Sequence, residues 1–208
     1  MSYLQDPSLR LVLASQSTAR ARLLAAAGLD FEVRTAPVDE ALVRDGLAAD
    51  GVDGAEAAVA LASIKGERVA ATAARDELVI AGDQLLETAD GAWPDKPETR
   101  EAVAAQLRCL AGSTHSLHTA AVVFRGGVRV WHHVASPKVT MRPLSEAFIE
   151  RYLAAAGDTL LGCVGGYQVE GLGGHVLTRI HGDRHAVEGL PLLPLVAALR
   201  EQGALHPD

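Results

Sequence analysis

Short apolar segments alternate with helix-forming segments along most of the chain, and this alternation limits the fold more than any other feature. Residues 9–14 (LRLVLA) are apolar and compatible with a buried strand, and residues 19–27 that follow are mostly strong helix formers. Gly28 comes directly after the helix-forming segment and is suited to end it. A repeated order of strand and helix is typical of α/β proteins, so we predict an α/β fold with a central sheet flanked by helices.

The remaining expected elements continue this order. Further strands are expected at residues 31–35, 78–81, 117–124, 128–139 and 176–180, and further helices at 55–75, 98–110, 145–155 and 191–201. Residues 41–54, through which Asp and Gly are scattered, are expected to be a loop or only weakly helical. The Gly126-Gly127 pair between two strand segments predicts a hairpin, and therefore a mixed sheet.

The charge balance limits the partners of the chain. Nineteen basic and 26 acidic residues give a formal net charge of -7, which disfavours binding to a nucleic acid polymer. Aromatic residues make up only 4% of the chain, so stacking platforms for single strands are scarce. A phosphate-bearing ligand must therefore meet a local group of cations.

The cysteines and the distribution of apolar residues indicate a location. Cys109 and Cys163 are too few for a disulfide framework, which is compatible with a reducing compartment. No apolar run approaches the roughly 18 residues of a membrane span, and the N-terminal residues lack the pattern of a signal peptide. We expect a cytoplasmic protein that does not act on membranes.

The first group of candidate site residues lies between the first strand and the first helix. Ser15, Ser17 and Arg20 follow the apolar segment, where the unpaired N–H groups of a helix N-terminus favour an anion. Arg20 can bind two phosphate oxygens at once. The alternative is an ordinary serine cap followed by a surface arginine, which is the more common arrangement.

An acidic residue follows the strand expected at residues 78–81. Asp83 lies just past this strand, and ligands of open α/β sheets bind beyond the carboxyl ends of strands. A carboxylate there can bind a divalent cation or activate water. The alternative is a turn aspartate, and the residues alone do not decide between the two.

Two lysines and a second acid complete the charged candidates. Lys65 lies within the long alanine-rich helix, and Lys96 precedes Pro97, which restrains it to an extended conformation. Glu40 is an acid that could add a second carboxylate to a metal site. Taken singly, a solvated lysine or an exposed loop acid is the commoner case.

Two further patterns argue against other functions. The glycine-dense segment from Gly162 to Gly174 lets the backbone approach a ligand, but it lacks the G-x-G-x-x-G fingerprint of a dinucleotide fold. The histidines form no metal motif, so we expect them to be surface or strand residues, and no serine lies in a G-x-S-x-G elbow.

Taken in order, these segments resemble the Maf family of nucleotide pyrophosphatases. The family opens with Leu-Ala-Ser-x-Ser-Pro-Arg-Arg-x-x-Leu-Leu, and this chain has LASQSTARARLL from Leu13. Later family patterns match, in the same order, Phe31-Glu32-Val33, Val38-Asp39-Glu40, Lys65, Ile80 to Asp83, Asp95-Lys96-Pro97, Leu107 to His115, Gln168 to Gly173 and Val187 to Pro191. The resemblance covers residues 9 to about 201 and implies a Maf/ITPase-like fold, a single domain of two lobes around a cleft over residues 1–208.

The departures from the family pattern point to one of its branches. Ala19, Gln84, Cys163 and Glu170 are similar to the 7-methyl-GTP pyrophosphatases rather than to the branch that cleaves dTTP and UTP. A glutamate can accept hydrogen bonds from the N1–H and exocyclic amine of guanine, and it favours a cationic methylated ring. Asp95 stands where the family has glycine, and the sequence offers no reason for it.

The resemblance implies hydrolysis of a nucleoside triphosphate to the monophosphate and pyrophosphate, with a divalent metal cation, Mg or Mn, as cofactor. In the implied roles, Asp83 is catalytic and, together with Glu40, a metal ligand. The residues implied to bind the phosphates are Ser15, Arg20, Lys65 and Lys96, and those implied to read the base are Gln84 and Glu170.

Two other functions stay open. One is a pyrophosphatase of the dTTP/UTP type. The other is a non-catalytic nucleotide-binding regulator of cell division, which the missing first arginine, replaced by Ala19, favours. The sequence does not decide the oligomeric state, so a homodimer also stays open.

Overall fold

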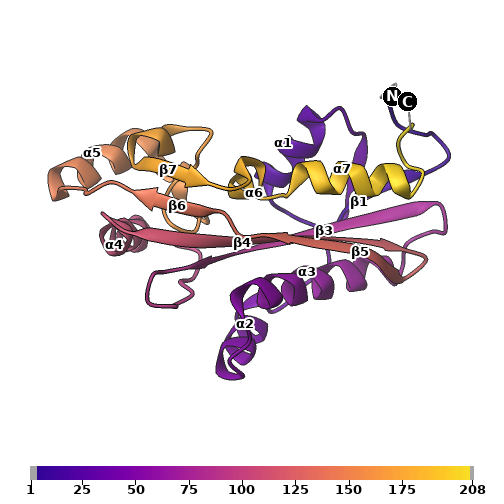
Figure 1. The fold of residues 1–208 in the computed structure, drawn as a ribbon, viewed down its shortest axis with the longest axis horizontal. Helices are drawn as coiled ribbons and strands as arrows, with labels where there is room; N and C mark the ends of the chain where they lie inside the picture. The colour runs from indigo at the N-terminus through magenta and orange to yellow at the C-terminus, as the bar shows by residue number, and fades with distance from the viewer. Residues whose placement is uncertain (1–3, 207–208) are drawn as a thin grey trace.

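One mixed sheet runs the length of the molecule (Figure 1). The computed structural model describes residues 4–206. Its strands are β1 Arg10–Leu13, β2 Phe31–Val33, β3 Glu77–Glu87, β4 Thr114–Arg125, β5 Val128–Ala135, β6 Lys138–Met141 and β7 Leu177–His181. Its helices are α1 Thr18–Ala26, α2 Glu40–Ala49, α3 Gly54–Ala70, α4 Arg100–Leu110, α5 Glu146–Ala156, α6 Arg184–Glu188 and α7 Leu192–Glu201. The prediction of an α/β fold is confirmed.

The strand order is β2-β1-β3-β4-β6-β7, and β5 pairs with β4 beside this path. β1 is parallel to β2 and β3, and the pairs from β3 onwards are antiparallel, so the sheet is mixed as predicted. The hairpin between β4 and β5 turns at Gly126 and Gly127, which have φ angles of 57° and 79°. Two successive positive φ angles explain why glycine occupies both positions.

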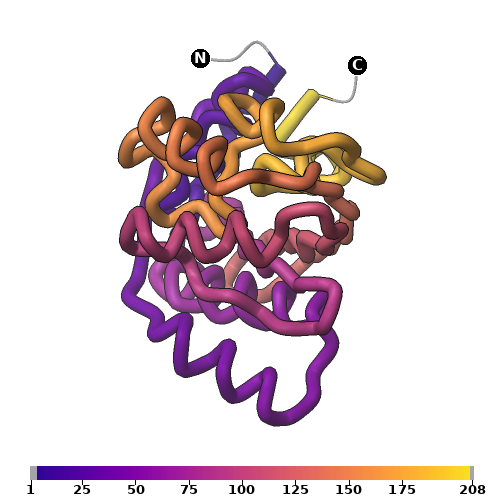
Figure 2. Tube along the Cα trace, turned by 90° about the vertical axis from the view of Figure 1, so that its left-hand side faces the viewer, coloured from indigo at the N-terminus to yellow at the C-terminus, as the bar shows by residue number. Residues whose placement is uncertain are grey.

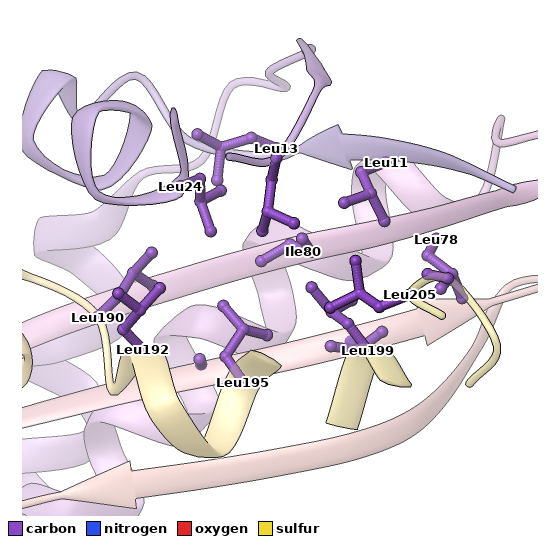
Figure 3. Packing of buried hydrophobic residues seen from close by; sticks show 14 of the residues in the cluster. Leu11, Leu13, Leu24, Leu78, Ile80, Leu190, Leu192, Leu195, Leu199 and Leu205 are labelled. Carbon is purple, nitrogen blue, oxygen red and sulfur yellow. The ribbon is translucent and has the colours of Figure 1, made fainter. Parts of the chain in front are cut away.

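Successive residues of β3 face opposite sides of the sheet, and each side is covered by different helices. Leu78 and Ile80 pack in a core with residues of α1 and α7 (Figure 3), whereas Val79 and Ala81 pack against α3. Each fully buried side chain of this size contributes about 1.5–3 kcal/mol to folding. The two cores fix β3, and with it every polar residue further along the same strand.

The two ends of the sheet differ in their cover. α4 and α5 share a third core with β6 and β7, at the end away from α7. α2 lies outermost, beyond α3 from the sheet (Figures 1 and 2), and none of its residues is buried. The prediction of one domain of two lobes stays a prediction.

Three predicted elements need correction. The sequence predicts that β3 ends at Ala81, but the strand continues to Glu87, because Gly82 to Gln84 pair with β4, which satisfies their backbone groups. Residues 41–54 are expected to be a loop or only weakly helical, and most of them form the regular helix α2. Its first turn is capped by the Asp39 side chain, which accepts from the N–H of Leu42 at 3.0 Å. The strand expected at 128–139 is two strands, β5 and β6, divided around Pro137, which lacks an N–H.

No helix within residues 4–206 is both long and apolar enough to cross a membrane. Cytoplasmic location stays a prediction.

Candidate active site

A large cavity opens where β1 ends. β1 stops at Leu13, which pairs with Ile80, whereas β3 continues for seven more residues to Glu87. The cavity, of about 540 Å³, is lined by residues 14–20 directly after β1, by Gln84 of β3, and by part of the glycine-rich segment. The rule that ligands bind beyond the carboxyl ends of parallel strands therefore applies to β1.

Asp83 does not lie beyond the end of a strand, as the sequence predicts. The sequence pattern places Asp83 beyond a strand end, but the residue lies inside β3, opposite Ala120 of β4. Neighbouring strand residues point to opposite faces, so Asp83 and Gln84 lie on different sides of the sheet. Past the end of β1, however, cavities adjoin β3 from both sides. Asp83 lines a second cavity of about 520 Å³ that shares Gln84, Glu40 and Lys96 with the first.

The predicted site residues thus come together around two adjoining cavities. The larger cavity is lined by Ser15, Arg20, Glu40, Lys65, Gln84, Lys96 and Glu170, and the smaller one by Asp83.

Arg20 is held firmly at the start of α1. Ser17 caps the helix, accepting from the N–H of Arg20 at 3.4 Å. The buried guanidinium donates through Nη1 to Ser15 Oγ at 3.0 Å and through Nε to the Gly189 carbonyl at 3.0 Å. Burial lowers the pKa of Arg20, while the charges of Asp83 and Glu40 oppose that shift. Ser15 therefore positions Arg20 in addition to lining the cavity.

Gly82 lets Arg20 lie this close to the sheet. A Cβ at Gly82 would be 3.3 Å from Arg20 Nε and 3.0 Å from both Leu190 Cδ2 and the Ala120 carbonyl oxygen. The backbone carbonyl cannot readily yield, so a side chain at this position would displace the guanidinium.

Lys65 joins the two acids of the site. Its Nζ lies 2.8 Å from Glu40 Oε2 and also forms an ion pair and hydrogen bond with Asp83 Oδ1. Lys96 Nζ lies 3.3 Å from the same Glu40 oxygen. The side chains of Lys65 and Asp83 are only 11% and 7% exposed, and buried charges are costly unless paired. The acids therefore compensate the lysines in the free protein.

The ionisation of Glu40 follows from its surroundings. Burial raises the pKa of this carboxyl group, but hydrogen bonds and charge from Lys65 and Lys96 outweigh burial and lower it below its usual range. Glu40 is therefore an anion at neutral pH.

The donor set determines which metal the site suits. The described residues contain no cluster of three His, Cys, Asp or Glu side chains. Asp83 and Glu40, which contact the same ammonium, offer hard carboxylate oxygens. Mg²⁺ is commonly bound by one or two carboxylates, with water and substrate phosphates completing its coordination. The residues present fit such a cation.

Gln84 is held by its amide nitrogen. Nε2 donates to Thr119 Oγ1 at 2.9 Å and to the Ala186 carbonyl at 2.8 Å, while Oε1 has no hydrogen-bond partner within residues 4–206. The side chain therefore presents an acceptor to a ligand.

Glu170 is paired with a residue that the sequence reasoning missed. Its Oε1 forms an ion pair and hydrogen bond with Arg22 of α1, while the glutamate side chain stays 21% exposed. The partners are 148 positions apart, and only the charge of Arg22 could have signalled the contact.

His115 and Tyr167 were also missed as site residues. Tyr167 lines the cavity, and its Oη lies 2.7 Å from His115 Nε2. Burial lowers the pKa of His115 to about 4, so the ring is neutral at pH 7. His115 is a buried residue of β4, in keeping with the expectation that the histidines are surface or strand residues.

The chain is similar in sequence to known proteins. A family model described as Maf-like protein matches residues 10–202. The chain is 45% identical to a nucleoside triphosphate pyrophosphatase of Rhodospirillum rubrum over 205 residues, 99% of each chain. It is 47% identical to one of Hyphomonas neptunium over 193 residues, 93% of this chain and 96% of the other.

A 7-methyl-GTP pyrophosphatase of Rhizobium meliloti is 44% identical over 195 residues, 94% of this chain and 97% of the other. Among solved structures, a HAM1 protein from Coxiella burnetii matches with a TM-score of 0.46 at 17% identity, covering 93% of this chain and 99% of that one.

Proposed function

The chain belongs to the Maf family, and from this premise we propose that it hydrolyses a 7-methyl-GTP-like purine nucleoside triphosphate, with a divalent cation as cofactor. It is a nucleotide pyrophosphatase, a hydrolase of phosphoanhydride bonds, the activity named for the relatives above. The products are the nucleoside monophosphate and pyrophosphate.

One observation carries the proposal: Asp83 and Glu40 both contact Lys65, which lines the larger cavity together with Arg20 and Lys96. A triphosphate needs several cations to offset its charge, and this net-acidic chain gathers three of them at one place. We call Ser15, Arg20, Lys65 and Lys96 the phosphate end of the cavity.

In the proposed reaction, water attacks the α-phosphorus and the bond to the oxygen that bridges the α- and β-phosphorus atoms breaks. Pyrophosphate leaves with that oxygen, and Asp83 accepts a proton from the water. Arg20, Lys65 and Lys96 offset the negative charge that gathers on the leaving group. Such a reaction depends mainly on positioning and charge neutralisation.

The cation would be held by Asp83 and Glu40, the two carboxylates that contact Lys65. When bound, it supplies Lewis-acid stabilisation of charge on phosphoryl oxygens. Lys65 must then exchange a carboxylate contact for a phosphate contact, which its flexible stem permits.

We assign base recognition to Gln84 and Glu170, the base end of the cavity. The Oε1 of Gln84 and the Glu170 oxygen not bonded to Arg22 are acceptors, and guanine offers an N1–H and an exocyclic amine as donors. Uracil and thymine offer a single edge donor, so two acceptors favour a guanine-type base. The relative from Rhizobium meliloti, named for 7-methyl-GTP, supports this choice.

The test is a substrate panel of 7-methyl-GTP, GTP, UTP and dTTP, each assayed with Mg²⁺, with Mn²⁺ and with a chelator. We expect pyrophosphate, not orthophosphate, as the released product, with kcat/KM highest for 7-methyl-GTP and no turnover in the chelator. Faster cleavage of UTP or dTTP would instead assign the dTTP/UTP-type activity. Binding without any turnover would assign the non-catalytic regulator.

A further inference from the structure

Two ion pairs join α2 to the loop between β3 and α4. In one the helix supplies the acid, and in the other the helix supplies the base. Glu40 accepts from Lys96, with Oε2 and Nζ 3.3 Å apart, and Arg44 forms an ion pair with Asp95. Glu40 and Arg44 are four residues apart and therefore lie on the same side of the helix. Their partners are consecutive in the loop, so the two pairs together set how the loop lies against α2.

Apolar packing of these two segments comes from the partly buried Val43 and Leu47 of α2, from Trp93 of the loop, and from the buried Pro97. α2 has no buried residue, and both Asp95 and Lys96 are exposed. Apolar packing therefore holds the backbone near Lys96, whereas the exposed Lys96 side chain is placed by its polar contact with Glu40.

Asp95 also connects the loop to the base end. Its backbone carbonyl accepts from Gln106 Nε2 of α4 at 2.6 Å, and Gln106 Oε1 accepts from the N–H of Gly165 at 2.7 Å. The Pro97 carbonyl accepts from the N–H of Gly162 at 2.8 Å. One short stretch of loop thus contacts α2, α4 and the glycine-rich segment.

The proposed function adds a requirement for the second ion pair. When a triphosphate and its cation bind, Lys96 and Glu40 are drawn to phosphate and metal, and their mutual contact no longer fixes the loop. Arg44 and Asp95 line the smaller cavity with Asp83 but not the larger one, and their ion pair can stay in place. The ion pair with Arg44 thus gives a structural reason for Asp95, which stands where the family has glycine.

We propose that Arg44 and Asp95 are positioning residues, whose ion pair holds Lys96 at the phosphate end while substrate is bound. This inference rests on the proposed function for the role of Lys96. It assigns no contact with substrate to either residue.

The test is a double-mutant cycle between Asp95→Asn and Lys96→Met. The readouts are calorimetric binding of the α,β-methylene analogue of GTP with Mg²⁺, which cannot be cleaved at the α–β position, and the steady-state kinetics. An exposed ion pair contributes little, so Asp95→Asn should weaken binding and raise KM by about threefold to fivefold, with kcat within about twofold. In the Lys96→Met background the same change should have no further effect.

Three further variants complete the design. Arg44→Gln should weaken binding and raise KM as much as Asp95→Asn does. The double variant Arg44→Asp with Asp95→Arg, which swaps the two charges, should recover most of the lost affinity. Glu146→Gln is the matched control, because Glu146 forms an exposed ion pair with Arg108 that lies outside both cavities. It should leave binding unchanged.

Hydrogen exchange of the free protein gives a readout that needs no ligand. Asp95→Asn should speed exchange across residues 92–98, and Glu146→Gln should not. Unchanged exchange, or equal loss of affinity with and without Lys96, would overturn the positioning role. If the wild type releases no pyrophosphate while the exchange result holds, the proposed function fails and the ion pair's control of the loop stands.

Discussion

The phosphate end and the base end of the cavity are built from different kinds of structure. At the phosphate end, Arg20 and Lys65 project from helices α1 and α3, and Asp83 beside them projects from the centre of β3. At the base end, Glu170 lies on a segment of turns and short 3-10 helices, in which Gly165 and other glycines have positive φ angles. Arg20, Lys65 and Asp83 are therefore held by elements that pack in buried cores, whereas Glu170 is held on a segment of turns, where it pairs with Arg22.

This difference indicates what each end can tolerate. A side chain on a strand between two cores cannot move to compensate for a change, because packed interiors transmit displacements. A segment of turns can adjust, and its polar contacts can be exchanged one at a time. We therefore expect changes at the phosphate end to remove turnover, and changes at the base end to alter selectivity.

The largest effect is expected for Asp83→Asn. The amide cannot accept the proton of the attacking water, so kcat should fall by about 10²–10⁴-fold, the usual contribution of a general base. Pyrophosphate release measures the loss, and circular dichroism should show an unchanged fold. Asp76→Asn, an exposed aspartate paired with Arg10, is the control and should keep full activity. Near-normal turnover of Asp83→Asn would contradict the expectation that changes near the phosphate end remove turnover.

A smaller effect is expected for Glu170→Gln at the base end. The amide loses the charge and one acceptor position, so the ratio of kcat/KM for 7-methyl-GTP to that for UTP should fall roughly tenfold, as expected for one charged hydrogen bond. The kcat for UTP should stay within about twofold, because the phosphate end is untouched. An equal loss for both nucleotides would show that Glu170 supports the chemistry and not the choice of base.

The smallest effect on activity is expected for His115→Gln, which tests how the base end is stabilised. The pKa of His115 is about 4 in the folded protein and near 6.5 when unfolded, so the unfolded state binds more protons between these values. Stability from this group is fully present above pH 6.5 and is lost as pH falls towards 4, by up to about 3 kcal/mol.

Urea unfolding at pH 7 and at pH 4.5 measures this loss. The glutamine side chain that replaces His115 cannot titrate but can still reach the Tyr167 hydroxyl, so the variant should lose less stability over this interval than the wild type. Activity at pH 7 should change little. Identical pH dependence in the two proteins would mean that the buried ring does not contribute to acid sensitivity.

The sequence predicted the α/β class, most strands and helices and several of the residues that line the cavity. Local patterns carry this information: the mostly apolar residues 9–14 favour a buried strand, and Ser17 next to helix formers caps α1. The chain-wide order of motifs placed Glu40, Lys65, Asp83 and Lys96 in one site, and the structure brings them together.

Only the tertiary structure decided what lies opposite each residue. β3 runs past Asp83 because β4 pairs with it, and no property of Gly82-Asp83-Gln84 alone favours a strand. The pairs Arg22–Glu170 and Arg44–Asp95 join residues 148 and 51 positions apart. Side-chain periodicity reports which face of an element is buried, but contacts between distant residues depend on strand register and helix packing, which the whole chain sets together.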